Sequence, residues 1–273
     1  MKLNLKKNIL IISVIIIIIL LLFLYNKKEL FTDNNNKILE YLKVYNFTKD
    51  KKIRLGEKGD GGYIIGDVEH IYDCYISAGI SNEESFTKDF KNRYEIDMSN
   101  CFAFDGTIEK YPYEYTKDIS FIKKNINSFN DDNNTNLHSI INKYNNIFLK
   151  MDIEGGEFPW LLSLNIKQLN KFKQIVIELH GINDDSWNST LNDKTTCLQK
   201  LASTHYLIHA HGNNYSPTQN NIPDVIELTY LHKSLFNSKP NLNSIKLPIN
   251  DLDYVNNKGI NDIDLSFYPF YSK

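Results

Sequence analysis

The sequence predicts an α/β fold in which a mainly parallel sheet carries helices on both faces. Two observations support this class. After residue 50, short apolar runs that are typical of buried strands alternate with amphipathic, helix-like segments. The strand-like runs end, one after another, in a glycine, an acid or a histidine. The length of 273 residues suits one sizeable domain with an appendage.

Seven apolar runs are expected to form the strands of this sheet: residues 72–79, 101–105, 119–124, 146–152, 173–181, 206–212 and 224–231. One helix is expected directly after the fourth strand, and others over residues 83–94, 135–144 and 194–203. Ser81 and Glu84 have the spacing of a capping box, which favours a helix that begins right after the first strand. Upstream, five glycines within residues 54–66 predict tight turns around a short strand at 63–65.

Residues 9–25 form an apolar segment that only Ser13 interrupts. As a helix this segment would span about 26 Å, which is close to the thickness of a thin bilayer. No small-residue cleavage site follows it, so the segment predicts a single transmembrane anchor rather than a removable signal peptide. The alternative, a buried core helix, is rarely so uniformly apolar.

The lysines that flank this segment indicate an orientation. Lys2, Lys6 and Lys7 precede it, whereas acidic residues offset the lysines that follow it. The positive-inside rule therefore favours a cytoplasmic amino terminus and a lumenal or external domain. Glycosylation sequons would fit that side, and the chain has four, at Asn46, Asn133, Asn188 and Asn214.

The chain thus divides into a short basic tail (1–8), a transmembrane anchor (9–25), a stalk (26–50), the α/β domain (51–235) and a C-terminal surface extension (236–273). A net charge of −2 with scattered lysines argues against a nucleic-acid partner. The three cysteines are odd in number and lack CxxC spacing, so buried thiols are expected rather than a disulfide framework.

Polar residues at the ends of the expected strands predict a ligand site. In open α/β sheets ligands bind beyond the carboxyl ends of the strands, near the point where the strand order reverses. The residues at these ends are Gly79, Asp105, Asp152, His180 and His211. We expect them to line one crevice.

Gly79 and Asp105 suggest specific contacts in that crevice. A glycine lets the backbone approach a bound molecule closely, and the helix that follows favours negative groups. An acid that ends the neighbouring strand can accept hydrogen bonds from the hydroxyls of a ribose. The alternative for Asp105 is a simple turn before Gly106. The segment "SAGISNE" has one glycine and therefore lacks the three of a dinucleotide fingerprint.

Around "LKMDIEGGEF" the sequence resembles the FkbM-type methyltransferases, and most closely the subgroup that carries "DGGY" and "IELHG" motifs. Seven segments resemble that subgroup in the same order and together span about residues 50–235: "RLGEKGDGGY" (54–63), "ISAGISNEESF" (76–86), "FAFDGT" (102–107), "LKMDIEGGE" (149–157), "QIVIELHG" (174–181), "HAHGNN" (209–214) and "PDVIELTY" (223–230).

This resemblance implies the Rossmann-like class I methyltransferase fold and the use of S-adenosylmethionine, usually to methylate a hydroxyl. By position, Gly79 and Glu83 would belong to the cofactor loop and Asp105 would hold the ribose. Asp152 would lie beside the transferred methyl group. The sequence departs from the subgroup at Ser81, where a glycine is common.

Methyl transfer to a hydroxyl needs in-line placement and removal of a proton. His180 is a candidate base because its ordinary pKa lies near neutrality. Asp152 competes with it, either directly or through a metal ion. Glu157 is a third catalytic candidate, or else an acid that the helix dipole favours. If Mg²⁺ or Mn²⁺ binds, we expect the ligands Asp152, His180 and His211.

Two acids and one aromatic residue complete the set of candidates. Glu154 shares a face with the metal-ligand candidates only if the strand continues through it. Glu178 lies in a strongly apolar strand and needs a partner, either a structural one or a functional one. Trp187, in a polar loop, could stack on a sugar ring.

The leading hypothesis is a membrane-anchored, S-adenosylmethionine-dependent O-methyltransferase that acts on a glycan or a small molecule. One alternative is a metal-dependent hydrolase or type II glycosyltransferase that uses the rim of acids and histidines, with "DLD" at 251–253 as a metal motif. Another is a degenerate methyltransferase fold used for binding, which Ser81 alone supports.

Overall fold

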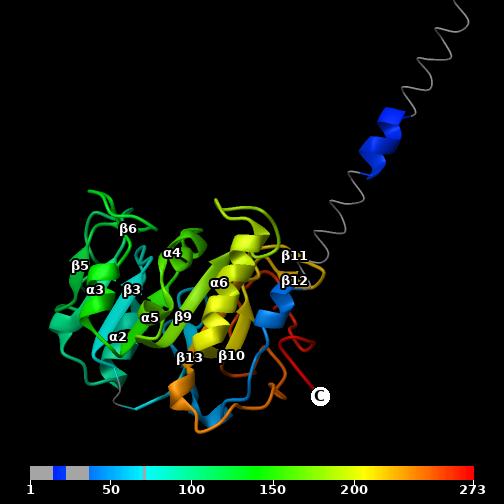
Figure 1. Cartoon of the computed structure of the whole chain (residues 1–273). Coiled ribbons are helices and arrows are strands. Elements are labelled where there is room, and N and C mark those ends of the chain that lie inside the picture. Colours follow the sequence, from blue (N-terminus) through cyan, green and yellow to red (C-terminus); the bar gives the residue numbers. More distant parts are fainter. Residues whose placement is uncertain (1–14, 23–36, 70–71) are drawn as a thin grey trace, which may run out of the picture.

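The computed structural model describes residues 15–22, 37–69 and 72–273. Its centre is a seven-stranded sheet, and all seven expected strands are present in it (Figure 1). In spatial order the strands are β10 (His205–Gly212), β13 (Val225–His232), β9 (Phe172–His180), β8 (Ile147–Met151), β3 (Cys74–Ala78), β4 (Cys101–Phe104) and β5 (Ser120–Ile122).

The sheet is mainly parallel, as predicted. Strands β5, β4, β3, β8 and β9 run in one direction, and only β13 runs against its neighbours β9 and β10. The short hairpin of β11 (Thr218–Gln219) and β12 (Ile222–Pro223) links β10 to β13. No crossover helix lies in that link, so the chain returns antiparallel. The strand order reverses beside β3, which has β4 on one side and β8 on the other.

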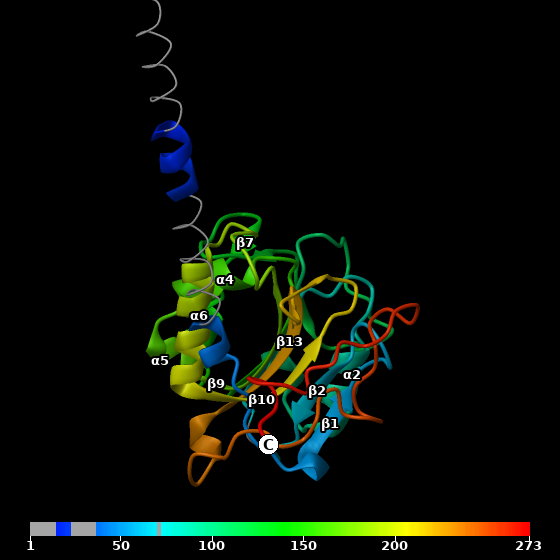
Figure 2. The same cartoon turned by 90° about the vertical axis from the view of Figure 1, so that its right-hand side faces the viewer.

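Helices cover one face of the sheet, and a helix and a hairpin cover the other (Figure 2). The first face carries α4 (Glu157–Ser163), α5 (Ile166–Leu169) and α6 (Leu191–Thr204), and α3 (His138–Lys143) packs against α5. The second face carries α2 (Ser85–Arg93) and the β1–β2 hairpin (Lys52–Leu55 and Tyr63–Gly66). The remaining short elements are η1 (Lys49–Lys51), η2 (Met98–Asn100), β6 (Asn125–Ile126), β7 (Asn134–Thr135) and η3 (Lys233–Leu235).

Local sequence explains the start of α6 but not that of α2. Thr190 and Asp193 form a reciprocal capping box before α6. The capping box predicted for α2 is wrong, because Ser81 adopts a left-handed conformation in the preceding loop. The carboxylate of Glu84 is buried instead and accepts hydrogen bonds from Ser77 (2.8 Å) and Tyr111 (2.9 Å).

Segments on either side of the α/β unit pack onto it. Residues 37–41 are helical, and Leu42 and Val44 are fully buried. Val44 pairs with Leu207 and so covers the outer edge of β10, which would otherwise expose unpaired backbone groups. The C-terminal segment also reaches the core, where it buries several apolar side chains, among them Leu247 and Phe270.

The predicted anchor is described only over residues 15–22, which are helical. The rest of segment 9–25 lies outside the described residues, as do the basic tail and residues 26–36 of the stalk. In the part of the chain that the structure describes, no helix has both the length and the apolar character needed to cross a membrane.

Candidate active site

A cavity of about 490 Å³ opens at the carboxyl ends of β3, β4 and β8. Its wall includes four residues that the sequence predicted for the cofactor or the reaction: Gly79, Glu83, Asp105 and Asp152. These four meet because each closely follows one of three adjacent parallel strands. The cavity lies where the strand order reverses, which is the usual ligand position in such sheets.

Gly79 is the point of closest approach between two loops of this site. Its φ is +75°, a left-handed conformation that a side chain disfavours. A Cβ atom there would overlap the carbonyl oxygen of Asp152. The N–H of Gly79 donates to Phe104 O (3.0 Å), and the N–H of Asp152 donates to Ala78 O (2.9 Å). Only glycine lets β3 end so close to the end of β8.

Asp105 holds the loop that follows β3. Its Oδ2 accepts hydrogen bonds from the N–H groups of Ile80 (3.0 Å) and Ser81 (2.9 Å). Its Oδ1 accepts from the N–H (2.7 Å) and the hydroxyl (2.6 Å) of Thr107. Burial by itself would raise the pKa of Asp105, but these hydrogen bonds outweigh it and keep the pKa below its ordinary value. A ribose hydroxyl would have to replace one of these donors.

The glycine-rich turn between β1 and β2 forms another wall of the cavity. Asp60 and Gly61 line it together with Glu83. The Glu83 side chain packs against Gly61, where a Cβ atom would overlap its carboxylate, and it also accepts a hydrogen bond from the N–H of Ser85 (2.7 Å). The turn therefore contributes directly to the predicted cofactor site.

Beyond Asp152, a group of buried polar residues continues the site away from the cavity. The Tyr63 hydroxyl lies 3.0 Å from Asp152 Oδ2 and 3.3 Å from Glu178 Oε2, so it bridges the two acids. Asn213 Nδ2 donates to the other oxygen of Glu178 (2.8 Å). Burial, reinforced by the charges of Asp152 and Glu227, raises the pKa of Glu178 well above its ordinary value.

His180 ends β9 beside these acids. Its Nδ1 lies 3.0 Å from Oε1 of Glu157, and the same oxygen accepts the N–H groups of Ile153 and Gly155 (both 3.2 Å). Its Nε2 lies 3.6 Å from Glu154 Oε2. Burial alone would lower the pKa of His180, but the bond and charge of Glu157 prevail and raise it to about 9. His180 therefore holds a proton at neutral pH.

Trp187 lies against the same corner of the molecule. Its ring packs over Gly155 and Gly181, where added Cβ atoms would overlap it, and the ring centre is 5.7 Å from that of His180. The residue is nevertheless 44% exposed. Part of this aromatic residue is thus open to solvent next to His180.

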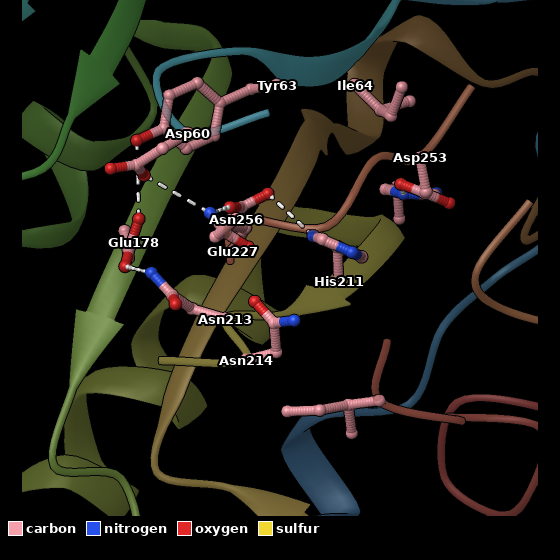
Figure 3. Close-up of polar contacts among 12 residues, drawn as sticks. Asp60, Tyr63, Ile64, Glu178, His211, Asn213, Asn214, Glu227, Asp253 and Asn256 are labelled. Carbon is pink, nitrogen blue, oxygen red and sulfur yellow. Dashed lines mark hydrogen bonds and ion pairs between the residues drawn. The ribbon is translucent and has the colours of Figure 1, made fainter. Parts of the chain in front are cut away.

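His211 does not join Asp152 and His180, although we expected all three as metal ligands. Its Nδ1 lies 3.2 Å from Glu227 (Figure 3), and its Nε2 lies 3.1 Å from Asp262. Instead, Asp152 and His180 form a compact group with Glu178, within which the potential ligand atoms all lie within 4.8 Å of one another.

The "DLD" motif does not supply a pair of metal ligands at the cavity. Asp253 is buried, where it contacts His209 Nε2 (2.8 Å) and accepts the N–H of Ile249 (2.5 Å). Asp251 is exposed in a turn with a left-handed φ of 69°. The motif therefore fastens the C-terminal segment to β10.

Sequence reasoning assigned no role to four polar residues of the site, namely Tyr63, Thr107, Lys150 and Asn213. All four lie within motifs of the resemblance, and for Tyr63, Thr107 and Asn213 that was the only signal. Lys150 interrupts an apolar strand, and this could have marked it. Its buried ammonium donates to Gly79 O (2.8 Å) and lies 5.5 Å from the centre of the Tyr63 ring.

Comparison with known proteins supports the relationship that the motifs suggested. A family model described as the methyltransferase FkbM domain matches residues 68–215, just over half of the chain. No curated protein matches the sequence. The matched region begins before β3 and ends after β10, so it contains most of the residues that line the cavity.

Proposed function

The chain belongs to the FkbM methyltransferase family, and on this premise we propose that it methylates a hydroxyl group of a glycan or small molecule. Methyltransferases of this family generally use S-adenosylmethionine. The observation that carries the proposal is the cavity at the strand-order reversal, which brings together Gly79, Glu83 and Asp105. Its volume of about 490 Å³ falls within the usual range for small-molecule sites.

The residues present fit the cofactor. Gly79 removes the side chain that would otherwise fill the cradle, and Asp105 holds the loop with charge-assisted hydrogen bonds. Asp60 and Glu83 add negative charge to the wall, which suits a cationic sulfonium. Ser81 already accommodates the left-handed conformation, so its side chain does not prevent the loop from forming.

Bound S-adenosylmethionine would supply an activated methyl group whose bond to sulfur breaks, leaving the electron pair on sulfur, as the new oxygen–carbon bond forms. The chain must orient the hydroxyl and remove its proton. Asp152 and Glu154 both border the cavity, and either carboxylate can receive the proton. His180, kept in orientation by Glu157, can position the hydroxyl oxygen.

The exposed ring of Trp187 supports a sugar as the acceptor. Aromatic rings offer an apolar face to the C–H surface of a pyranose, and this one lies beside His180. An acceptor stacked on Trp187 would present its hydroxyls near Glu154 and His180, at the polar end of the site.

Residues 9–25 are proposed to anchor the enzyme in a membrane, with the catalytic domain on the lumenal or external side. The flanking lysines support this orientation. In the described part, Ile15 to Leu22 each leave about half of their side chains exposed, which bilayer lipid would cover. Translation with microsomes tests the orientation. We expect glycosylation at the exposed Asn133 and Asn188; an unmodified but membrane-bound chain would place the domain on the cytoplasmic side.

Calorimetric titration of the full chain in detergent with S-adenosylmethionine tests the proposed function. We expect one site per chain with micromolar affinity. A folded protein that fails to bind, with or without Mg²⁺ or Mn²⁺, would contradict the proposal and favour a degenerate fold used for binding.

A further inference from the structure

We propose that Asp152, Glu178 and His180 bind one divalent cation of the Mg²⁺ or Mn²⁺ class beside the cofactor cavity. Its role in orienting the acceptor hydroxyl rests on the proposed methyltransferase function, whereas the binding of the ion does not. The ligand set differs from the one that the sequence suggested, because buried Glu178 takes the place of His211.

The geometry of the three side chains fits a single ion. Asp152 follows β8, and Glu178 and His180 end the neighbouring parallel strand β9, so all three lie at the same edge of the sheet. Their ligand atoms lie within 4.8 Å of one another. Two atoms on one ion at about 2.1 Å can be no more than about 4.2 Å apart. Small side-chain rotations would therefore close the group around a cation.

The imidazole of His180 is oriented as a metal ligand would be. Glu157 engages its Nδ1 at 3.0 Å, which directs Nε2 toward Glu178 Oε1 (3.8 Å). A carboxylate behind a histidine ligand is the usual outer partner in metal sites, where it fixes the ring and its tautomer. Glu157 is completely buried, and its Oε2 has no hydrogen-bond partner in the described chain. Burying a carboxylate oxygen without a partner is unfavourable, and it is explained if Glu157 is there to orient His180.

The carboxyl groups of Asp152 and Glu178 are held in place by uncharged donors. Tyr63 bridges Asp152 and Glu178, and Asn213 donates to Glu178, so neutral donors orient both acids. His180 is the only base within 4 Å of Glu154, Glu157 or Glu178 in the described residues. Two buried acids, Glu157 and Glu178, thus lie around one imidazole with the half-buried Asp152 beside them, and a divalent cation would stabilise the charged forms of these acids.

Two carboxylates and one imidazole suit a hard or borderline cation and leave coordination positions open. An acceptor hydroxyl could occupy one of them, next to the cavity that Asp152 borders. A bound hydroxyl loses its proton more readily. That proton would pass to the carboxylate of Glu154, whose side chain is 78% exposed, and then to water. Binding of the ion would release the proton of His180 Nε2 to water, and the oxidation state of the ion would not change.

The site can be tested without any methyl acceptor. The full chain in detergent is titrated with Mn²⁺, and electron paramagnetic resonance measures the ion that stays free. We expect one site per chain, with affinity at least 100-fold weaker in Glu178→Gln and about 10-fold weaker in Glu157→Gln. The control is Asp262→Asn, which removes an acid that pairs with His211 outside the proposed site and should leave the affinity unchanged.

Urea unfolding of each variant shows whether it has folded, and binding of S-adenosylmethionine shows whether its cofactor site is intact. Loss of Mn²⁺ binding in Glu178→Gln with cofactor binding intact would support the site. Equal Mn²⁺ affinity in the wild type, Glu178→Gln and Asp262→Asn would overturn it, as would the absence of a site tighter than millimolar. Mn²⁺ binding without cofactor binding would uphold the metal site while contradicting the proposed function.

Discussion

Asp105 provides a graded test of the cofactor loop. Its carboxylate accepts four hydrogen bonds from three residues, Ile80, Ser81 and Thr107. Asp105→Ala leaves three backbone N–H groups without this acceptor at a site where the wild-type residue is only 8% exposed. Each unmet donor costs about 1–3 kcal/mol when fully buried. Because water can reach part of the loop, we expect the substitution to remove about 2–4 kcal/mol of the free energy that stabilises this loop conformation.

This loss should appear mainly in cofactor binding, since the loop lines the cavity. A change of about 2.7 kcal/mol is a 100-fold change in affinity, so Asp105→Ala should weaken S-adenosylmethionine binding at least 100-fold. Asp105→Asn keeps one oxygen for the N–H groups of Ile80 and Ser81 and should weaken it about 10-fold. Thr107→Val removes only the hydroxyl donor and frees a position on Asp105 for a ribose hydroxyl. It should bind the cofactor as tightly as the wild type or more tightly.

Calorimetry with S-adenosylmethionine measures all three variants, and urea unfolding separates loss of binding from loss of fold. Affinity that stays within threefold of the wild type in Asp105→Ala would refute this reasoning. So would a larger loss in Thr107→Val than in Asp105→Asn, because the hydroxyl would then be a direct cofactor contact rather than a competitor.

Three further changes test other parts of the structure. Gly79→Ala should abolish cofactor binding in calorimetry, because the added Cβ would overlap a backbone carbonyl at a position with a positive φ. The control Gly259→Ala should show no such effect, because no backbone atom lies in contact range of the added Cβ. Asp253→Asn should destabilise the fold in urea by about 2–4 kcal/mol, because it breaks a buried pair with His209. Despite burial, His209 holds the pKa of Asp253 at about 2, below its ordinary 3.8. The stability that Asp253 contributes is therefore present above pH 4 and lost toward pH 2. Urea unfolding at pH 5 and pH 3 should show a larger drop in the free energy of unfolding for the wild type than for Asp253→Asn. Equal drops would contradict a lowered pKa of Asp253. Trp187→Ala should leave cofactor affinity unchanged but weaken the turnover of a sugar acceptor, and lost cofactor affinity would instead make the ring part of the cofactor site.

The strands and the cofactor end of the site could be predicted because both depend on local patterns. Apolar runs marked every strand of the sheet, and residues that follow adjacent parallel strands must converge. Gly79, Asp105 and Asp152 therefore share one cavity. The prediction for His211 did not account for the insertion of β13 between β9 and β10. Chain order alone does not reveal that insertion, which separates His211 from His180.

Contacts between distant segments explain what else the sequence concealed. Tyr63 reaches Asp152 and Glu178 from a hairpin about a hundred residues earlier in the chain. No spacing rule links such positions, and only the packing of the β1–β2 hairpin on the sheet brings them together. The capping box at Ser81 failed for a related reason, since tertiary bonds of Glu84 prevailed over a local motif.

Hydrogen exchange of the full chain with and without S-adenosylmethionine tests the central claim, that the cofactor binds in the cavity at the strand-order reversal. We predict slower exchange on cofactor binding in the loops at 59–62, 79–84 and 104–107, with little change in β10 and β13. Unchanged exchange in these loops, or protection confined to another part of the molecule, would contradict the account.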